Sequence, residues 1–167
     1  DIMQQVVGSV AGQYGALTSA QARGSVAASI RSLGARECVY RGHQYFRELR
    51  WEDHAAMRDC LEQATETDPT YADAWALLAS LYAEEHSFDL DPRPNPLDRA
   101  LAAAQQAVEH DSSSTLAQQA LAEARFYRHE KDLLMAAAET AQSLNPNDSG
   151  LLMTLGFYGA YAGEWEQ

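Results

Sequence analysis

One short pattern, a leucine followed by a small residue, recurs along this chain and constrains its fold more than any other feature. The copies are Trp75-x2-Leu78-Ala79, Gln118-x2-Leu121-Ala122 and Leu152-x2-Leu155-Gly156. The second and third copies begin 34 residues apart. A period of this length is typical of repeat architectures, in which each unit buries its apolar face against its neighbours. The sequence therefore predicts a stacked array of similar units.

A second pattern alternates with the first and carries small residues at helical spacing. The copies are Met57-x3-Leu61-x2-Ala64, Ala100-x3-Ala104-x2-Ala107 and Leu134-x3-Ala138-x2-Ala141. Spacings of four and three residues place the members of each copy on one stripe of a helix. Alanine in such a stripe lets two antiparallel helices approach closely. Pro69 and Pro146 follow two of the copies and would end the helix there. Each unit is therefore predicted to be a helical hairpin.

Together these patterns resemble the tetratricopeptide repeat (TPR). The resemblance implies an all-α fold, a TPR-type right-handed superhelix of antiparallel helical hairpins with about three and a half repeats. The repeats would span about residues 36–70, 71–114, 115–148 and 149–167, and the last would lack its second helix.

The first 34 residues fit neither pattern. Apolar residues between Ile2 and Leu17 share one helical face, and a second helix would run from a cap at Thr18 or Ser19 to about Ser32. We expect residues 1–34 to form N-terminal capping helices, or the tail of a preceding domain, and residues 35–167 to form the array.

The second hairpin contains an insertion. The span from Trp75 to Ala100 is nine residues longer than the equivalent span from Gln118 to Leu134, and the extra residues fall between His86 and Pro96. Three prolines in this insertion forbid a continuous helix, and they predict a stiff, projecting loop.

Several segments give a narrower resemblance. They are Asp1-Ile-Met-Gln-Gln5, Tyr40-Arg-Gly42, Asp91-Pro-Arg-Pro-Asn-Pro96 and Ala160-Tyr-Ala-Gly-Glu-Trp165. They look like the C-terminal region of bacterial adenylate-cyclase-like or CadC-like transcriptional regulators, in which TPRs follow a TolB-like domain. This resemblance implies a regulatory module attached to an output domain elsewhere, and it implies no cyclase chemistry in this segment.

The charge balance excludes some partners. Twenty-four acidic residues against 12 Lys and Arg give a formal net charge of −12. We expect no binding of nucleic acid, because phosphates require clustered Lys and Arg and only scattered arginines occur. The sequence has no run of about eighteen apolar residues, so we expect this segment not to span a membrane.

The compartment is only weakly indicated. The chain begins at Asp1 without a basic and apolar signal region, so we expect any targeting segment to lie upstream. We expect a cytoplasmic location, with the periplasmic side of a membrane-anchored regulator as the alternative.

Two cysteines, Cys38 and Cys60, should lie on the two helices of the first hairpin. A pair of cysteines is compatible with a disulfide. Cysteines on helical faces are more often buried thiols, so the sequence favours thiols and leaves the disulfide open.

Few residues suggest catalysis or metal binding. His86, Asp89 and Asp91 cluster in the insertion, but they lack the glycine and the distal glutamate of a calcium loop. The sequence shows no nucleophile elbow, phosphate loop or paired cysteine ligands. We therefore expect no enzymatic activity, no cofactor and no metal.

A candidate binding face follows from the resemblance, because the first helix of each TPR hairpin lines the concave side of the superhelix. The residues on this helix that are offset from the Leu-Ala stripe are His43, Phe46, Arg47, Ser80, Glu84, Gln119, Glu123, Phe126, Tyr127, Met153, Phe157 and Tyr161. The aromatic members would form a strip that suits apolar anchors of a peptide or helix. The alternative is that some of these rings pack beneath neighbouring helices. The Lys and Asn residues with which some TPRs hold a C-terminal carboxylate are missing from this face.

These observations predict a non-enzymatic protein-interaction or sensory scaffold module of a larger bacterial signalling protein. One alternative is a regulatory domain that binds a small ligand in its groove and controls an attached cyclase or transcription factor. Another is a self-association platform. The last helix carries Leu152, Leu155 and Gly156 on a stripe that would lack its partner helix, so we expect a homodimer through the truncated repeat, or a displaced last helix, to cover it.

Overall fold

The computed structural model describes residues 30–163, and these residues are mostly helical. The helices are α3 (Ile30–Glu48), α4 (His54–Thr67), α5 (Ala72–Phe88), α6 (Pro96–His110), α7 (Thr115–Tyr127), α8 (Lys131–Leu144) and α9 (Ser149–Ala162). A short 3-10 helix, η1 (Trp51–Asp53), precedes α4. No strand occurs within residues 30–163, so the predicted all-α class is confirmed. The capping helices expected over residues 1–34 lie almost wholly outside the described range.

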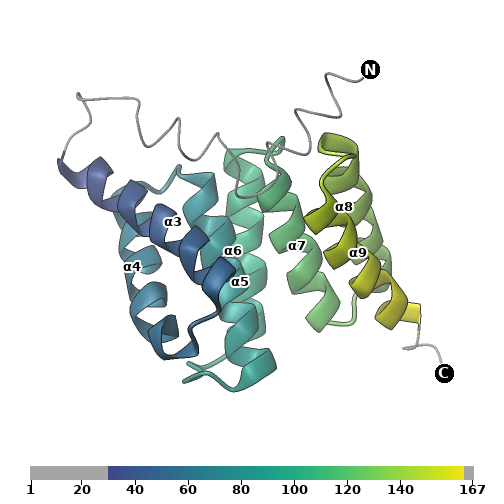
Figure 1. Ribbon diagram of the computed structural model, residues 1–167, viewed down its shortest axis with the longest axis horizontal. Helices are drawn as coiled ribbons and strands as arrows, with labels where there is room; N and C mark the ends of the chain where they lie inside the picture. Colours follow the sequence, from purple (N-terminus) through teal and green to yellow (C-terminus); the bar gives the residue numbers. More distant parts are fainter. Residues whose placement is uncertain (1–29, 164–167) are drawn as a thin grey trace.

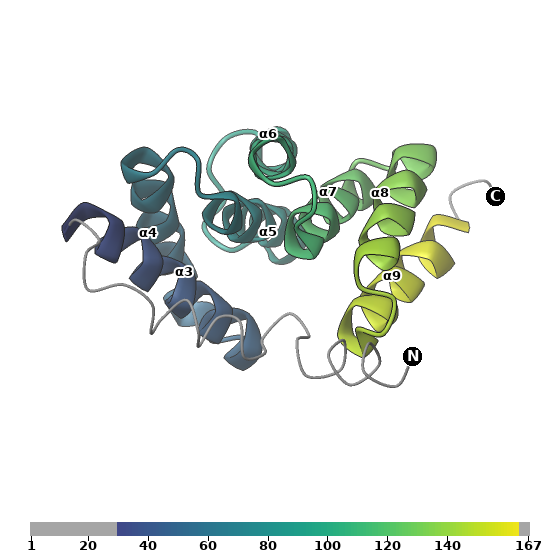
Figure 2. The ribbon, with the colours of Figure 1, turned by 90° about the horizontal axis from the view of Figure 1, so that it is seen from above.

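The helices form two layers of a curved array (Figure 1). Helices α3, α5 and α7 lie on the concave side and α4 and α6 on the outer side, while α8 and α9 form the other end of the array (Figure 2). Consecutive helices pack as the pairs α3/α4, α5/α6 and α7/α8, and each inner helix also contacts the next inner helix. The two helices of each pair are joined by residues 49–53, 89–95 and 128–130, and the second of these connections lies within the insertion that the sequence predicts to break the helix.

The core consists largely of alanine at the helix contacts. All nine residues of the small-residue pattern are buried, from Leu61 and Ala104 at 0% exposed to Ala138 at 8%. Gly42 shows how closely the inner helices approach, because a Cβ atom built on it would lie 2.9 Å from Cδ1 of Leu77. The side chains are small where helix axes come together, as the pattern predicts.

Polar side chains define the helix ends. Ser114 and Asp148 cap α7 and α9 by accepting hydrogen bonds from the backbone N–H groups of Ala117 and Leu151. Asp111 accepts from the N–H of Ser113 in the turn that follows α6. These local bonds explain why the hairpin boundaries could be located from the sequence.

The proline-containing insertion is tied to the outer helix α4. Arg93 forms ion pairs with Asp59 at 2.6 Å and Glu62 at 2.7 Å, both on α4. Arg58 of α4 binds the backbone oxygen of Asp91 at 3.0 Å. The predicted break in the helix is present, and these contacts hold the loop against the array.

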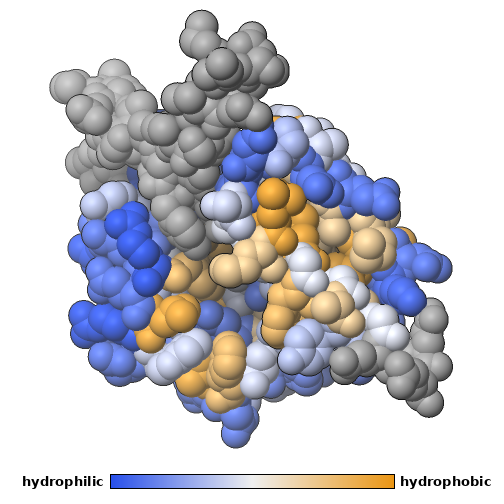
Figure 3. Space-filling model, turned by 45° about the vertical axis from the view of Figure 1, so that its right-hand side comes forward, coloured by the Kyte–Doolittle hydropathy of each residue, from blue (hydrophilic) through white to orange (hydrophobic). Residues whose placement is uncertain are grey.

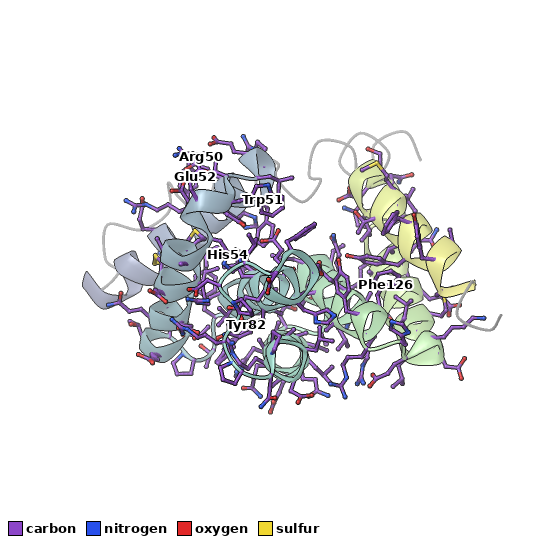
Figure 4. All side chains as sticks on the ribbon, turned by 90° about the horizontal axis from the view of Figure 1, so that it is seen from below. Arg50, Trp51, Glu52, His54, Tyr82 and Phe126 are labelled. Atoms are coloured by element: carbon purple, nitrogen blue, oxygen red, sulfur yellow. A yellow bond between two sulfur atoms is a disulfide. The ribbon has the colours of Figure 1, made fainter. Side chains whose placement is uncertain are left out.

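Cys38 of α3 and Cys60 of α4 form a disulfide, which joins the two helices of the first hairpin (Figure 4). The sequence favours free thiols at these positions, and this prediction is wrong. The hairpin brings the two Cα atoms to 5.5 Å, within the range that a disulfide requires. Helical spacing gives the face of each cysteine but not the distance between two faces.

Candidate binding groove

The concave side contains a cavity, also called the groove below, to which α3, α5, α7 and α9 all contribute. Its volume is about 170 Å3, and its walls are Phe46 from α3, Leu77, Ser80 and Glu84 from α5, Leu116, Gln119 and Glu123 from α7, and Thr154 and Tyr158 from α9. The residues on α5 and on α7 each follow one helical stripe, with spacings of three and four residues. The antiparallel pairing of the outer helices therefore leaves one face of every inner helix directed into a common space.

Two carboxylates in this cavity are held by hydroxyl groups. The hydroxyl of Tyr45 donates to Oε2 of Glu84 at 2.8 Å, and both side chains are buried. The hydroxyl of Ser80 donates to Oε2 of Glu123 at 2.6 Å. Tyr158 also hydrogen-bonds to Glu123. The carboxylates belong to adjacent inner helices and are fixed in position by residues from α3, α5 and α9.

Both carboxylates have a strongly raised pKa. Burial raises the pKa of Glu84 to about 8, with a further contribution from the negative charge of Glu123, while the Tyr45 hydrogen bond acts in the opposite direction. Burial raises the pKa of Glu123 to about 7, against hydrogen bonds from Ser80 and Tyr158. At neutral pH these groups therefore take up protons much more readily than surface carboxylates do.

The predicted binding-face residues separate into three groups. Phe46, Ser80, Glu84, Gln119 and Glu123 line the cavity. His43 and Phe126 are buried at 5% and 9% exposed, and Tyr127 is half-buried. The remaining residues are exposed, namely Arg47, Met153, Phe157 and Tyr161.

The predicted aromatic strip is not continuous. Phe126 packs in the core and stacks on Tyr158 with ring centroids 4.6 Å apart, so this residue follows the alternative in which some rings lie beneath neighbouring helices. Phe157 and Tyr161 form an exposed pair with centroids 4.5 Å apart. Apolar surface gathers on the side of the molecule that carries α8 and α9 (Figure 3).

Four cavity residues were missed, namely Leu77, Leu116, Thr154 and Tyr158. Leu77 and Leu116 could have been found by extending the stripes of Ser80 and Gln119 one turn towards the N-terminus. On α9 the cavity residues are Thr154 and Tyr158. The prediction named Met153 and Phe157, because it assumed that α9 has the same rotation about its axis as the first helices of the earlier hairpins. A rotation of one helix about its axis leaves no sequence signal.

The stripe for which the sequence predicts a missing partner is partly open to solvent. Leu152 is 38% exposed, Leu155 is half-buried and Gly156 is exposed. Leu151, Tyr158 and Ala162 are the buried residues of α9, and Leu155 packs against the core cluster that contains Tyr158 and Ala162.

A larger hollow of about 370 Å3 lies beside α3 and α4, and its lining includes Arg41 and Arg50. Arg41 is paired with Glu37, and Arg50 is paired with Glu52 and Asp53. These cations are already neutralised by neighbours on their own segments, so the hollow is a weaker candidate for an anion site than its arginines suggest.

Within residues 30–163, no three or more His, Cys, Asp and Glu side chains lie close enough together to hold a metal ion. None of the helices described is both long enough and apolar enough to cross a bilayer. A comparison of the chain with models of known protein families found no match, and a comparison with curated proteins found no significant relative.

The raised pKa of Glu84 predicts a pH-dependent stability. The pKa is about 8 in the folded protein against an ordinary 4.5, so the unfolded chain binds fewer protons and stability falls as pH rises towards 8. Glu84→Gln should remove this loss, and the variant should gain about 2 to 3 kcal/mol relative to wild type between about pH 6 and 9. Chemical denaturation at several pH values would measure the difference.

The comparison of variant and wild type isolates Glu84 from its surroundings. The groups that face it are Tyr45, His54, Glu123, Tyr127 and Tyr158. Burial lowers the pKa of His54 and that of His43, so these histidines reduce stability at acid pH, and for this reason the two proteins are compared at pH 6 and above. Glu66→Gln on the exposed face of α4 is the matched control. A stability difference that does not change with pH would contradict the prediction.

Proposed function

We propose that this chain is a non-enzymatic, TPR-like protein-interaction module that holds a peptide or helix of its partner in the concave groove. The observation that carries the proposal is the cavity formed jointly by α3, α5, α7 and α9. A surface built from four helices suits an extended or helical segment, which can contact several of them at once. The hairpin order and the two-layer arrangement support the TPR-type superhelix.

Exposed apolar side chains next to the cavity also support a protein partner. Phe157 is 50% exposed and Tyr161 is 49% exposed. The ring of Phe157 lies 6.0 Å from that of Tyr158, a cavity residue. Aromatic side chains with large exposed areas are frequent anchors in protein interfaces. Together with the resemblance to bacterial regulators, these features favour a scaffold or sensory role within a larger signalling protein.

Selection from a displayed library of random peptides tests this proposal. Peptides that bind the wild-type chain should lose at least about tenfold in affinity for the Phe157→Ala/Tyr161→Ala double variant, because truncating interface aromatics commonly costs more than 1 kcal/mol. Both rings are half exposed, so helicity measured by circular dichroism should be nearly unchanged.

The matched control is Leu133→Ala/Met135→Ala, which removes two exposed apolar side chains from α8. Selected peptides should bind this control as they bind wild type. Recovery of no binding peptide, or an equal loss in both double variants, would refute a groove-based interaction.

A further inference from the structure

Helix α5 carries two consecutive buried glutamates whose surroundings are opposite. Glu85 pairs with Arg58 at 2.8 Å and with Arg99 at 3.0 Å. Glu84 receives a hydrogen bond from Tyr45, and its nearest basic group is the buried His54, at 3.9 Å. Burial lowers the pKa of His54, which makes this imidazole neutral at pH 7. The carboxylate that faces the outer helices is thus fully paired, whereas the one that faces the groove has no cation.

The second carboxylate of the groove, that of Glu123, also lacks a cationic partner among the described residues. Neither Glu84 nor Glu123 forms an ion pair with Lys or Arg in the part of the chain that the structure describes. None of the nine residues lining the cavity is Lys or Arg. The negative charge of Glu123 raises the pKa of Glu84, and both carboxylates line the same cavity. Burial raises the pKa of both carboxylates because uncompensated negative charge in this cavity is unfavourable, and a cation placed between them would stabilise the charged form of both.

The hydrogen bonds inside the protein leave acceptors for a ligand. Tyr45 and Ser80 each bind Oε2 of their carboxylate. No described residue donates a hydrogen bond to Oε1 of Glu84, although this side chain is about nine-tenths buried. The acceptors thus come from separate helices and are held apart by the fold.

The rest of the cavity is apolar. Phe46, Leu77 and Leu116 form wall segments beside the carboxylates. Long basic side chains bury their methylene stems on such surfaces while the charged group binds at the end. Arginine fits better than lysine, because its planar guanidinium carries five donors in a fixed fork and can bind two carboxylates at once.

We propose that the cavity between Glu84 and Glu123 is an anchor pocket for an arginine side chain of the protein partner. The proposal rests on the proposed function and adds to it the chemistry of the residue that is recognised. The arginine stem lies against Phe46, Leu77 and Leu116, and its guanidinium donates to both carboxylates. The charge complementarity is local, and the chain's net charge of −12 would attract a basic partner from a distance.

The test compares arginine with citrulline, each with its amino and carboxyl groups blocked. Citrulline has nearly the shape of arginine but carries no charge. The isotopically labelled chain is titrated with Nα-acetyl-L-arginine methylamide and, separately, with Nα-acetyl-L-citrulline methylamide, and amide chemical shifts are followed by NMR. The arginine probe should shift the amides around Ser80 and Gln119 and should bind at least about tenfold more tightly than the citrulline probe.

Isosteric variants locate the pocket. Glu84→Gln/Glu123→Gln should weaken the arginine probe at least about tenfold, since both charges are removed while shape is kept. Glu139→Gln, on the exposed face of α8, is the control and should leave the affinity unchanged. Amide spectra away from the cavity report whether each variant is folded.

Several results would overturn the proposal. They are equal affinity for the two probes, unchanged affinity in the double variant, shifts centred elsewhere, or no charge-dependent shift up to about 20 mM, which covers millimolar dissociation constants. Tighter binding of free agmatine than of the blocked arginine would indicate a small-molecule amine instead of a protein side chain. Selected peptides that bind the groove without arginine would refute the arginine pocket and leave the proposed function standing.

Discussion

Replacing Glu85 with alanine should lower the free energy of unfolding by about 3 to 5 kcal/mol, because it removes the centre of a buried ionic network. The Glu85 side chain is fully buried, and its partner Arg58 is 3% exposed. Glu85 also pairs with Arg99 and accepts from the backbone N–H of Arg93 at 3.2 Å. The variant would leave Arg58 buried beside little compensating charge. Urea unfolding followed by circular dichroism measures the loss.

A control from the same network separates buried from exposed contributions. Asp59 also pairs with Arg93, but its side chain is 60% exposed. Asp59→Ala should cost less than about 1 kcal/mol, as is usual for exposed ion pairs. If Glu85→Ala cost no more than Asp59→Ala, the network would not be the support for α4 and α5 that its geometry indicates.

The same network holds the proline-containing loop. Arg58 contacts Asp91, and Arg93 contacts Glu62, which also accepts from the hydroxyl of Tyr82. The guanidinium of Arg99 lies 3.8 Å from the centre of the Tyr82 ring. Loss of Glu85 should therefore loosen the loop together with the helix contacts.

The sequence predicted the helices and their order well, because the signals involved are local. Pro69 and Pro146 interrupt helical stripes, and the alanines at positions 100, 104 and 107 lie at the helix contacts. Such signals depend on residues within one or two turns of each other. They do not determine how consecutive units are rotated and stacked.

The candidate site was predicted only in part for that reason. Adjacent residues on a helix point about 100° apart, so Glu84 and Glu85 serve a groove and an ionic network, respectively. A charge pattern does not tell which acid will meet the arginines of α4 and α6. The rotation of α9 likewise placed Tyr158, not Phe157, in the cavity. These features arise from contacts between helices that are distant in sequence.

The disulfide could not be predicted for a related reason, since helical spacing does not give the distance between two helices. Its removal is the second change with a large expected effect. Cys38 and Cys60 are separated by 22 residues, and closing a loop of this length restricts the unfolded chain. Replacing both cysteines with serine should lower the free energy of unfolding by about 3 kcal/mol on the chain-entropy account. Because α3 forms one arm of the curved array, the loss should fall first on the α3/α4 hairpin (Figure 2).

Reduction of the wild-type chain supplies an independent measurement of the same quantity. A thiol-free reductant should bring the denaturation midpoint of wild type close to that of the serine variant, whose own midpoint should not change on reduction. A wild-type midpoint that stays the same after thiol counting has confirmed two free cysteines would contradict the prediction. Structural disulfides persist in oxidising compartments and are rare where thioredoxin and glutathione keep thiols reduced. The α3/α4 hairpin is therefore the part of the array whose stability depends most on the redox conditions around it.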